Sequence, residues 1–197
     1  CDAHERFPTG HLKYWYSYDI NQSTYESTGM DLAVGYTFED LGPVPGELDI
    51  RGIWTRRDKH EFATTASSTP SDSVGEVGYN DDIARLNFVY TTDSWLVSLQ
   101  ANYYSDALDD VNYGPDAYGN AVASNYVSSM TYLDLQVRHD LTDNVDVYFG
   151  VDNLTNKQPP YCPNCLNEPV PGAHYTAESY ARVWDSKYHY IGIRYNL

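Results

Sequence analysis

The chain has 197 residues, enough for one ordinary domain. Twenty-eight acidic residues against twelve basic ones give a formal net charge of −16, which argues against a nucleic-acid-binding protein because such a protein carries a basic face. Aromatic residues make up 15% of the chain, and 20 residues are Tyr. No apolar run reaches about 18 residues, so transmembrane helices are excluded, whereas transmembrane strands are not.

Alternation of apolar and polar residues recurs along the chain and predicts an all-β, antiparallel protein with about seven strands. The first strand is expected over about 12–38, with Asn21 and Gln22 as its interruption. The other six are expected around Leu48–Trp54, Ala84–Tyr90, Trp95–Tyr103, Leu133–Val137, Val145–Val151 and Ile191–Leu197. Most approach the roughly nine to eleven residues that a tilted strand needs to cross a bilayer.

The predicted connections alternate between short and long. Short turns are expected at 42–46, 92–94 and 142–144, and long polar connections at about 60–81, 106–128 and 156–185. A transmembrane β-barrel has this arrangement, with tight turns on the periplasmic rim and long loops outside the cell. We therefore predict a segment of a transmembrane barrel, in which all long connections lie at one end.

A soluble β-sandwich would show the same alternation, and its polar face would be solvated. The barrel is favoured because the apolar positions are nearly free of charge and end in aromatic residues, as at a membrane interface. The aromatic residues are Trp54, Tyr90, Trp95, Tyr103 and Tyr195. The charged residues of the opposite face are Asp31, Asp49, Arg51, Arg85, Asp134, Arg138, Asp146, Asp152 and Arg194.

This phase assigns individual side chains to lipid or to the interior of the barrel. Those expected in lipid include Leu135, Val147, Phe149, Ile191 and Ile193. Those expected in the interior include Gln136, Tyr148, Asp152 and Arg194. Seven strands do not close a barrel of the predicted kind, so the first and last strands are expected to pair with strands outside this chain.

Four segments resemble the barrel strands of TonB-dependent outer-membrane receptors. They are the loop tip Arg6–Leu12, the strand Ser27–Phe38, the hairpin Thr131–Pro160 with Gly150-Val-Asp-Asn-Leu154 and Pro159-Pro160, and the closing strand Tyr180–Leu197. The resemblance implies a barrel of about 22 strands with a plugged lumen. Residues 1–197 would then be the C-terminal portion of that barrel, with the plug and the earlier strands outside the chain.

The resemblance also implies a function and partners. The family carries out active transport of a scarce nutrient, such as a siderophore or an oligosaccharide, across the outer membrane of a Gram-negative bacterium. Its partners would be the remainder of the barrel and the plug, the TonB complex acting through the plug, and outer-membrane lipid with lipopolysaccharide. A passive porin-type barrel is the alternative, and a secreted β-sandwich binding module is a further one.

Three cysteines are present, two of them close together at Cys162 and Cys165. A disulfide that staples this connection is the favoured interpretation, because a redox motif needs a helix N-terminus and a zinc site needs four ligands. Cys1 is expected to pair with a cysteine upstream of this chain.

Ligand contacts are expected in the long connections, where Tyr offers a flat surface and a hydroxyl at low entropic cost. The candidate ligand-binding residues are Arg57, Tyr113, Asp116, Tyr118 and Tyr175. Arg56, Arg57 and Lys59 form a basic group that could meet an anionic ligand or lipopolysaccharide phosphate, or could simply offset the surrounding acids.

No cofactor is expected. The acidic residues of the 105–120 connection, Asp106, Asp109, Asp110 and Asp116, could coordinate calcium, but their spacing does not match an EF-hand and a solvated acidic loop is favoured. No nucleophile, base and orienting group can be assembled from the sequence, so the chain is not expected to be an enzyme.

Overall fold

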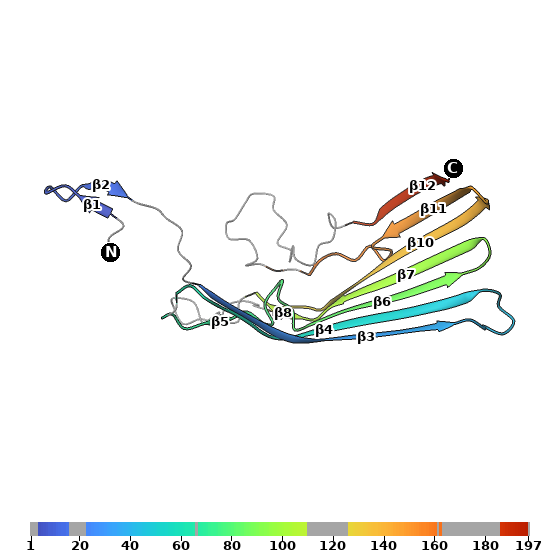
Figure 1. Ribbon diagram of the computed structural model, residues 1–197, viewed down its shortest axis with the longest axis horizontal. Coiled ribbons are helices and arrows are strands. Elements are labelled where there is room, and N and C mark those ends of the chain that lie inside the picture. Colours follow the sequence, from blue (N-terminus) through green and yellow to red (C-terminus); the bar gives the residue numbers. More distant parts are fainter. Residues whose placement is uncertain are drawn as a thin grey trace.

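The computed structural model describes residues 4–15, 23–65, 67–109, 126–160, 162 and 186–196, and every regular element among them is a strand (Figure 1). The strands are β1 His4–Arg6, β2 Leu12–Trp15, β3 Thr24–Phe38, β4 Glu47–Ala63, β5 Ser71–Asp72, β6 Asp82–Thr91, β7 Trp95–Tyr104, β8 Ala107–Leu108, β9 Tyr126–Val127, β10 Met130–Thr142, β11 Val145–Asp152 and β12 Tyr188–Tyr195. Within these residues no helix has the length and apolar character needed to span a bilayer.

Seven strands form the main sheet in the order β12-β11-β10-β7-β6-β4-β3, and each is antiparallel to its neighbours. The short β5 adds to this sheet by pairing with the end of β4. The prediction of an all-β antiparallel sheet is confirmed. Among the described residues the sheet is open, because β3 and β12 lie at its two edges and do not pair with each other.

The expected first strand over 12–38 is wrong. Leu12–Trp15 forms β2, which pairs with β1 in a separate two-stranded sheet, and the wall strand β3 begins only at Thr24. Gly10, at φ +86°, lets the chain reverse between β1 and β2, and its amide donates to the Phe7 carbonyl. Alternation shows that a segment is extended but does not identify its partner, which is why the two strands were joined. The expected interruption at 21–22 lies outside the described residues.

The three short connections gather at one end of the sheet, the turn end, and the three long connections leave from the opposite end, the long-connection end (Figure 1). In the turn between β3 and β4, the Asp40 carboxylate accepts a hydrogen bond from the Gly42 amide, and Gly42 and Gly46 take positive φ angles. Thr92 and Thr142 cap the other two turns by accepting from the amides of Trp95 and Asn144. The predicted placement of short and long connections is confirmed.

Cross-strand register divides the side chains of the main sheet between two faces. The apolar face carries Leu32, Val34 and Tyr36 of β3, Ile50 and Trp54 of β4, Leu86 and Phe88 of β6, Val97, Leu99 and Tyr103 of β7, Leu133, Leu135 and Val137 of β10, Val147, Phe149 and Val151 of β11, and Ile191 and Ile193 of β12. The polar face carries Asp31 and Thr37, Asp49 and Arg51, Arg85 and Asn87, Ser98, Gln100 and Asn102, Asp134, Gln136 and Arg138, Asp146, Tyr148 and Asp152, and Tyr190 and Arg194. The predicted phase is the one observed.

Two strands project past the others at the long-connection end. β3 has 15 residues and β4 has 17, whereas β11 and β12 have eight each. A β-bulge interrupts their pairing, because Thr28 faces Lys59 and Gly29 faces Arg57, which leaves Asp58 as the extra residue. Gly29 is required there, since a Cβ on it would overlap the Arg56 carbonyl oxygen.

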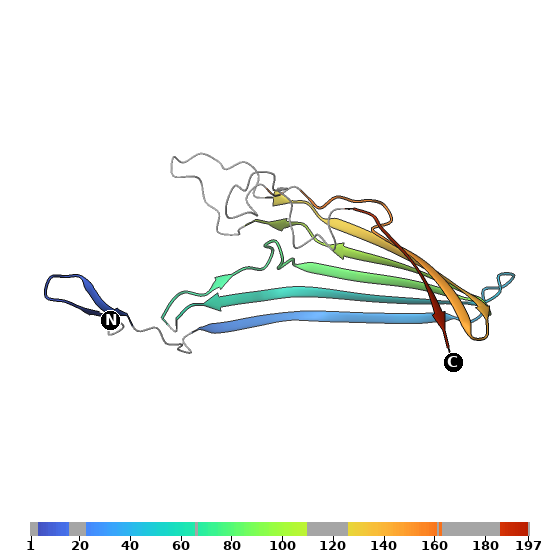
Figure 2. The same cartoon turned by 90° about the horizontal axis from the view of Figure 1, so that it is seen from above.

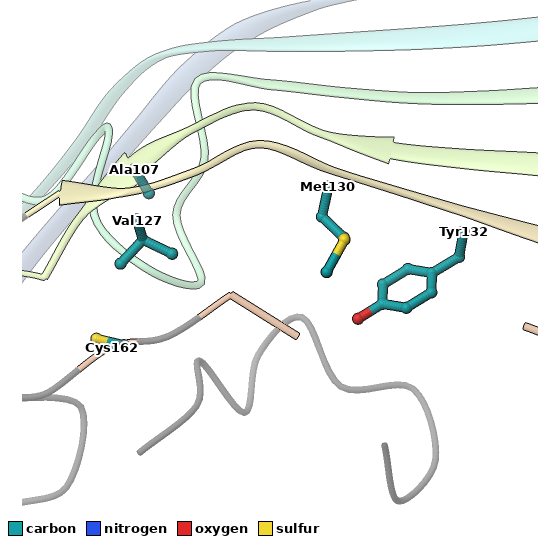
Figure 3. Close-up of a cluster of buried hydrophobic side chains, with 5 residues drawn as sticks. All are labelled: Ala107, Val127, Met130, Tyr132 and Cys162. Carbon is teal, nitrogen blue, oxygen red and sulfur yellow. The ribbon is translucent and has the colours of Figure 1, made fainter. Parts of the chain in front are cut away.

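Few hydrophobic side chains are buried, and most of those form one cluster at the long-connection end (Figure 3). The cluster consists of Ala107, Val127, Met130, Tyr132 and Cys162. By contrast, the apolar face is open: Ile191 is 82% exposed and Val34 is 63% exposed. The two views show one twisted sheet with no second large sheet packed on it among the described residues, so the β-sandwich alternative is not supported (Figures 1 and 2).

Candidate functional site

Of the predicted ligand-binding residues, Arg57 lies in the described part of the chain. Tyr113, Asp116, Tyr118 and Tyr175 lie outside the described residues. The acidic connection proposed for calcium is described only up to Asp109. Within the described ranges no group of three or more His, Cys, Asp or Glu residues is arranged to hold a metal ion.

Arg57 belongs to the polar face at the long-connection end, directly before the bulge at Asp58. Its guanidinium donates a hydrogen bond to the Asn80 carbonyl over 3.2 Å and lies 5.7 Å from the centre of the Tyr79 ring. At that distance the cation is attracted by the electron-rich face of the ring. Arg57 is therefore held in place by Tyr79 and Asn80, from the connection between β4 and β6, and is still half-exposed.

Two further side chains complete this group, which we call the Arg57–His60 cluster and define as Arg57, His60, Tyr79 and Tyr25. The His60 and Tyr79 rings are 4.1 Å apart, and the Tyr25 hydroxyl lies 2.9 Å from His60 Nδ1. Tyr25 is 61% exposed, so the cluster presents aromatic surface beside a cation. Such a surface suits a ligand that is anionic or has a flat face.

His60, Tyr25 and Tyr79 were not singled out from the sequence. Their placement depends on the bulge at Asp58, which shifts the alternation of β4 by one residue and returns His60 to the face of Arg57. The available signal was Gly29, a glycine inside an otherwise regular strand, because such glycines often mark a bulge.

Arg56 and Lys59 lie on the opposite side of the sheet from Arg57 and are paired with acids. Arg56 contacts Asp82 at 3.0 Å and Asp58 at 3.6 Å. Lys59 contacts Glu61 at 2.9 Å and Glu26 at 3.1 Å, and the hydrogen bonds that it donates to these two carboxylates raise the pKa of Lys59. Arg56 and Lys59 therefore offset nearby acids, which was one of the two alternatives for this basic group. Arg57 is the member of the group that stays a candidate for ligand contact.

Aromatic side chains lie at both ends of the apolar face. Trp54 and Tyr103 share a register row toward the long-connection end, where the Trp54 indole N–H donates to Asp82 over 3.0 Å. At the turn end Trp95 stacks on His139 with ring centres 4.1 Å apart. A band of apolar side chains bounded by indole groups with polar partners is the pattern of a membrane-facing surface.

A hydrogen-bonded network crosses the polar face from β6 to the end of β11. Asn102, which is 3% exposed, accepts from Arg85 Nε at 2.9 Å and from Gln100 Nε2 at 3.0 Å, and it donates to Asp134 at 3.2 Å. Asp134 also accepts from the Asn153 amide at 3.0 Å. The network ties β6, β7 and β10 together through side chains and adds the backbone of the residue that follows β11.

Three hollows lined by described residues lie on the polar face. Arg138, Asp146 and Arg194 contribute to the first, Asp49, Arg51 and Asn87 to the second, and Gln100, Gln136 and Tyr190 to the third. The polar face thus has hollows between its side chains. It is not uniformly polar, since Ile53, Ile83, Val89 and Leu96 also share its register.

Cys162 lies in the buried cluster at the long-connection end. It is fully buried, and its Sγ is 3.6 Å from a carboxylate oxygen of Asp109. Met130 and Tyr132 bring β10 into the same cluster, and Ala107 and Val127 bring the connection between β7 and β10 (Figure 3). Segments from different long connections therefore share one core. Cys165 lies outside the described residues, so the predicted disulfide stays a prediction.

No family model and no curated protein matches the chain. Among solved structures it is similar to a point mutant of the ferric enterobactin receptor from Pseudomonas aeruginosa, with a TM-score of 0.48 and 15% sequence identity. The match covers 86% of this chain and 22% of that receptor chain, so the chain spans about a fifth of its length.

Proposed function

We propose that residues 1–197 form part of the wall of an outer-membrane β-barrel that works in TonB-dependent uptake of a scarce nutrient. The observation that carries this proposal is the division of the sheet by register into an apolar face, open and aromatic at both ends, and a polar face with hollows between its side chains. An exposed apolar surface that extends over seven strands marks a membrane or protein contact. The strict alternation of turns and long connections favours a membrane barrel.

The sequence resemblance adds the remaining parts of the proposal. The chain would be the C-terminal portion of a larger barrel in a Gram-negative outer membrane, with β3 and β12 pairing to strands from outside residues 1–197. An unpaired strand edge in lipid leaves backbone groups unsatisfied, each at a cost of several kcal/mol. The plug would lie against the polar face and receive energy from the TonB complex, while lipid and lipopolysaccharide would cover the apolar face.

Ligand capture is proposed at the long-connection end. The Arg57–His60 cluster would contribute a cation and aromatic surface there. Tyr113, Asp116, Tyr118 and Tyr175 are proposed to contribute from the long connections. Arg57→Ala should weaken capture, whereas Arg51→Ala, which removes an arginine of the same face near the turn end, should leave it unchanged.

The stapled connection is also proposed for Cys162 and Cys165. A bond between them would close a small loop whose first residue is anchored in the core shared by Ala107, Val127 and Met130. Mass spectrometry of protein alkylated without reductant should find both sulfurs protected and linked to each other. Two alkylated thiols would contradict this bond.

A direct test is energy-dependent uptake by cells that produce the full-length protein. Uptake of its nutrient should stop when the proton-motive force is dissipated or TonB is deleted, while the protein stays in the outer-membrane fraction. Uptake that continues unchanged would contradict active transport and would favour the alternative, a passive porin-type barrel. Recovery of the protein in a detergent-free soluble fraction would overturn both barrel functions.

A further inference from the structure

Three tyrosines follow one another along the polar face of β11 and β12. The ring centres of Tyr188 and Tyr190 are 6.2 Å apart, and those of Tyr190 and Tyr148 are 6.4 Å apart. The row begins at the long-connection end of β12 and continues toward the turn end, where Arg194 and Asp146 face each other. We call this row the tyrosine track and define it as Tyr188, Tyr190 and Tyr148.

Two glycines let the track lie against the sheet. Tyr190 faces Gly150 across the strands, and Tyr148 faces Gly192. A Cβ on Gly150 would overlap the Tyr190 ring, and a Cβ on Gly192 would overlap the Tyr148 ring. Each ring therefore occupies the space that a side chain on the next strand would fill, and it covers the glycine backbone with one face. Tyr148 and Tyr190 nevertheless stay half-exposed.

Hydrogen-bonding groups border the track on the β10 side. Gln136 Nε2 donates to the Tyr190 hydroxyl over 3.3 Å, which fixes the ring across β11. Beside it lies a hollow of about 190 Å³ lined by Ser98, Gln100, Asp134, Leu135, Gln136 and Tyr190. Amide, hydroxyl and carboxylate groups thus lie next to the half-exposed Tyr190 ring.

We propose that the tyrosine track binds pyranose rings of an oligosaccharide. A pyranose has an apolar face of C–H groups, which packs on an aromatic ring, and an edge of hydroxyls, which both donate and accept hydrogen bonds. Tyr190 supplies the ring, and Gln136, Gln100 and Asp134 supply donors and acceptors at its border. Tyr188 and Tyr190 lie 6.2 Å apart and are inclined by 29°, so they offer neighbouring surfaces to two sugar units, and Tyr148, 6.4 Å beyond Tyr190 and inclined to it by 60°, offers an edge to a third.

The inference deepens the proposed function and rests on it, since the track must face the interior of the barrel at a place that the plug leaves open to water. The wall site is separate from the Arg57–His60 cluster, which lies at the far edge of the sheet on β3 and β4. The cluster would capture the ligand, and the track would hold it on the wall after entry. A neutral, hydroxyl-rich ligand fits the middle of the track because Tyr190 and its neighbour Gln136 carry no charge, although Arg138 faces Tyr148 and Asp152 faces Tyr188.

The test is calorimetric titration of the full-length protein, purified in detergent, with maltohexaose and with cellohexaose as probes. We expect one of the two to bind, and Tyr190→Ala to weaken that binding about tenfold or more, equivalent to about 1.4 kcal/mol. Tyr190→Phe keeps the ring and should stay within about threefold of the wild type. Tyr195→Ala, on the same strand but on the apolar face, is the matched control and should not change the affinity.

Gly150→Ala tests the same site without removing a tyrosine, because the new Cβ displaces the Tyr190 ring. It should weaken binding as Tyr190→Ala does. If Gly150→Ala fails to fold, Tyr148→Ala takes its place and should also weaken binding. Failure of both hexasaccharides to bind, or loss of thermal stability in Tyr190→Ala with unchanged affinity, would overturn the inference. The proposed function is judged separately, by membrane location and energy-dependent uptake of the wild type.

Discussion

The two faces of the main sheet share one backbone and nevertheless meet different surroundings. On the polar face side chains are paired with one another, as in the network around Asn102 and in the contact of Gln136 with Tyr190. On the apolar face side chains have little to pack against, so Ile193 is 70% exposed although it is as hydrophobic as a core residue. The difference fits the proposed function, in which the apolar face meets hydrocarbon and the polar face meets the interior of the barrel.

The largest expected effect comes from placing a charge on each face at the same height. Leu135 faces Leu99 and Val151 in the middle of the apolar face, and Gln136 is its neighbour on the polar face. Leu135→Arg should destabilise the barrel by about 2–4 kcal/mol, because the charge lies near the middle of the bilayer. Gln136→Arg should have little effect on stability. Urea titration of the folded barrel in lipid vesicles measures both.

The effect of a charge on the apolar face should also depend on its distance from the middle of the bilayer. Val147 is also on the apolar face, but it shares a register row with His139 and Trp95 at the turn end. Because the cost of a charge falls to about 0–1 kcal/mol near the interface, Val147→Arg should destabilise less than Leu135→Arg. Equal effects of Leu135→Arg and Gln136→Arg would show that the two faces do not differ in their surroundings.

The next effect concerns the polar face alone. Asn102→Ala removes three side-chain hydrogen bonds, those with Arg85, Gln100 and Asp134. Because Asn102 is buried, the loss should cost about 1–3 kcal/mol. Asn87→Ala is the matched control, since Asn87 is on the same face and the adjacent strand and has no comparable network. If both variants unfold at the same urea concentration, the network adds nothing to the stability of the wall.

The sequence was informative where a strand keeps its period for many residues. The phases of β7, β10 and β11 were predicted because Trp95–Tyr103 and Val145–Val151 alternate without a break. β5, β8 and β9 were not predicted, since a two-residue strand has no measurable period. The projection of β3 and β4 was missed for another reason, because Asp58 interrupts the period where the strand continues.

The candidate sites show the same limit. Arg57 could be named from its basic neighbours, but its partners Tyr79 and Asn80 come from a connection whose course the sequence does not reveal. The tyrosine track requires Tyr190 to face Gly150 and Tyr148 to face Gly192. These pairings depend on the register between β11 and β12, which the turns cannot set because a long connection joins the two strands.

A smaller effect is expected at the rim where the two faces end. Trp54 Nε1 and Arg56 Nη1 donate to different carboxylate oxygens of Asp82, each over 3.0 Å. Trp54→Phe keeps an aromatic ring on the apolar face and removes one of these bonds, so it should cost about 0.5–1.5 kcal/mol. Tyr103→Phe, in the same register row, serves as the control. Gels of samples heated to increasing temperatures should show that Trp54→Phe unfolds at a lower temperature than Tyr103→Phe.

The smallest effect lies beyond both faces, where β5 docks on β4. The Asp72 carboxylate accepts hydrogen bonds from the Val74 amide at 3.0 Å and the His60 amide at 3.1 Å, and these bonds, the one from Val74 foremost, lower the pKa of Asp72 below its ordinary value of 3.8. A carboxylate whose pKa is lower in the folded state stabilises that state above its unfolded pKa, and the contribution disappears as the pH falls through the folded pKa. The attachment of β5 should therefore be intact at neutral pH and weaken below about pH 4.

Hydrogen exchange at the Val74 and His60 amides, corrected for the intrinsic rate at each pH, measures this attachment directly. Protection should fall as the pH drops below about 4, while the amides of β7 in the middle of the wall keep theirs. In Asp72→Asn the two amides should be less protected at neutral pH, and their protection should no longer depend on acid. If the wild-type amides lose protection together with β7, the acid response belongs to the whole wall and not to the docking of β5. In that case β5 and the wall would unfold as one cooperative unit. Protonation of Asp72 would not be the cause, because its carboxylate does not contact β7.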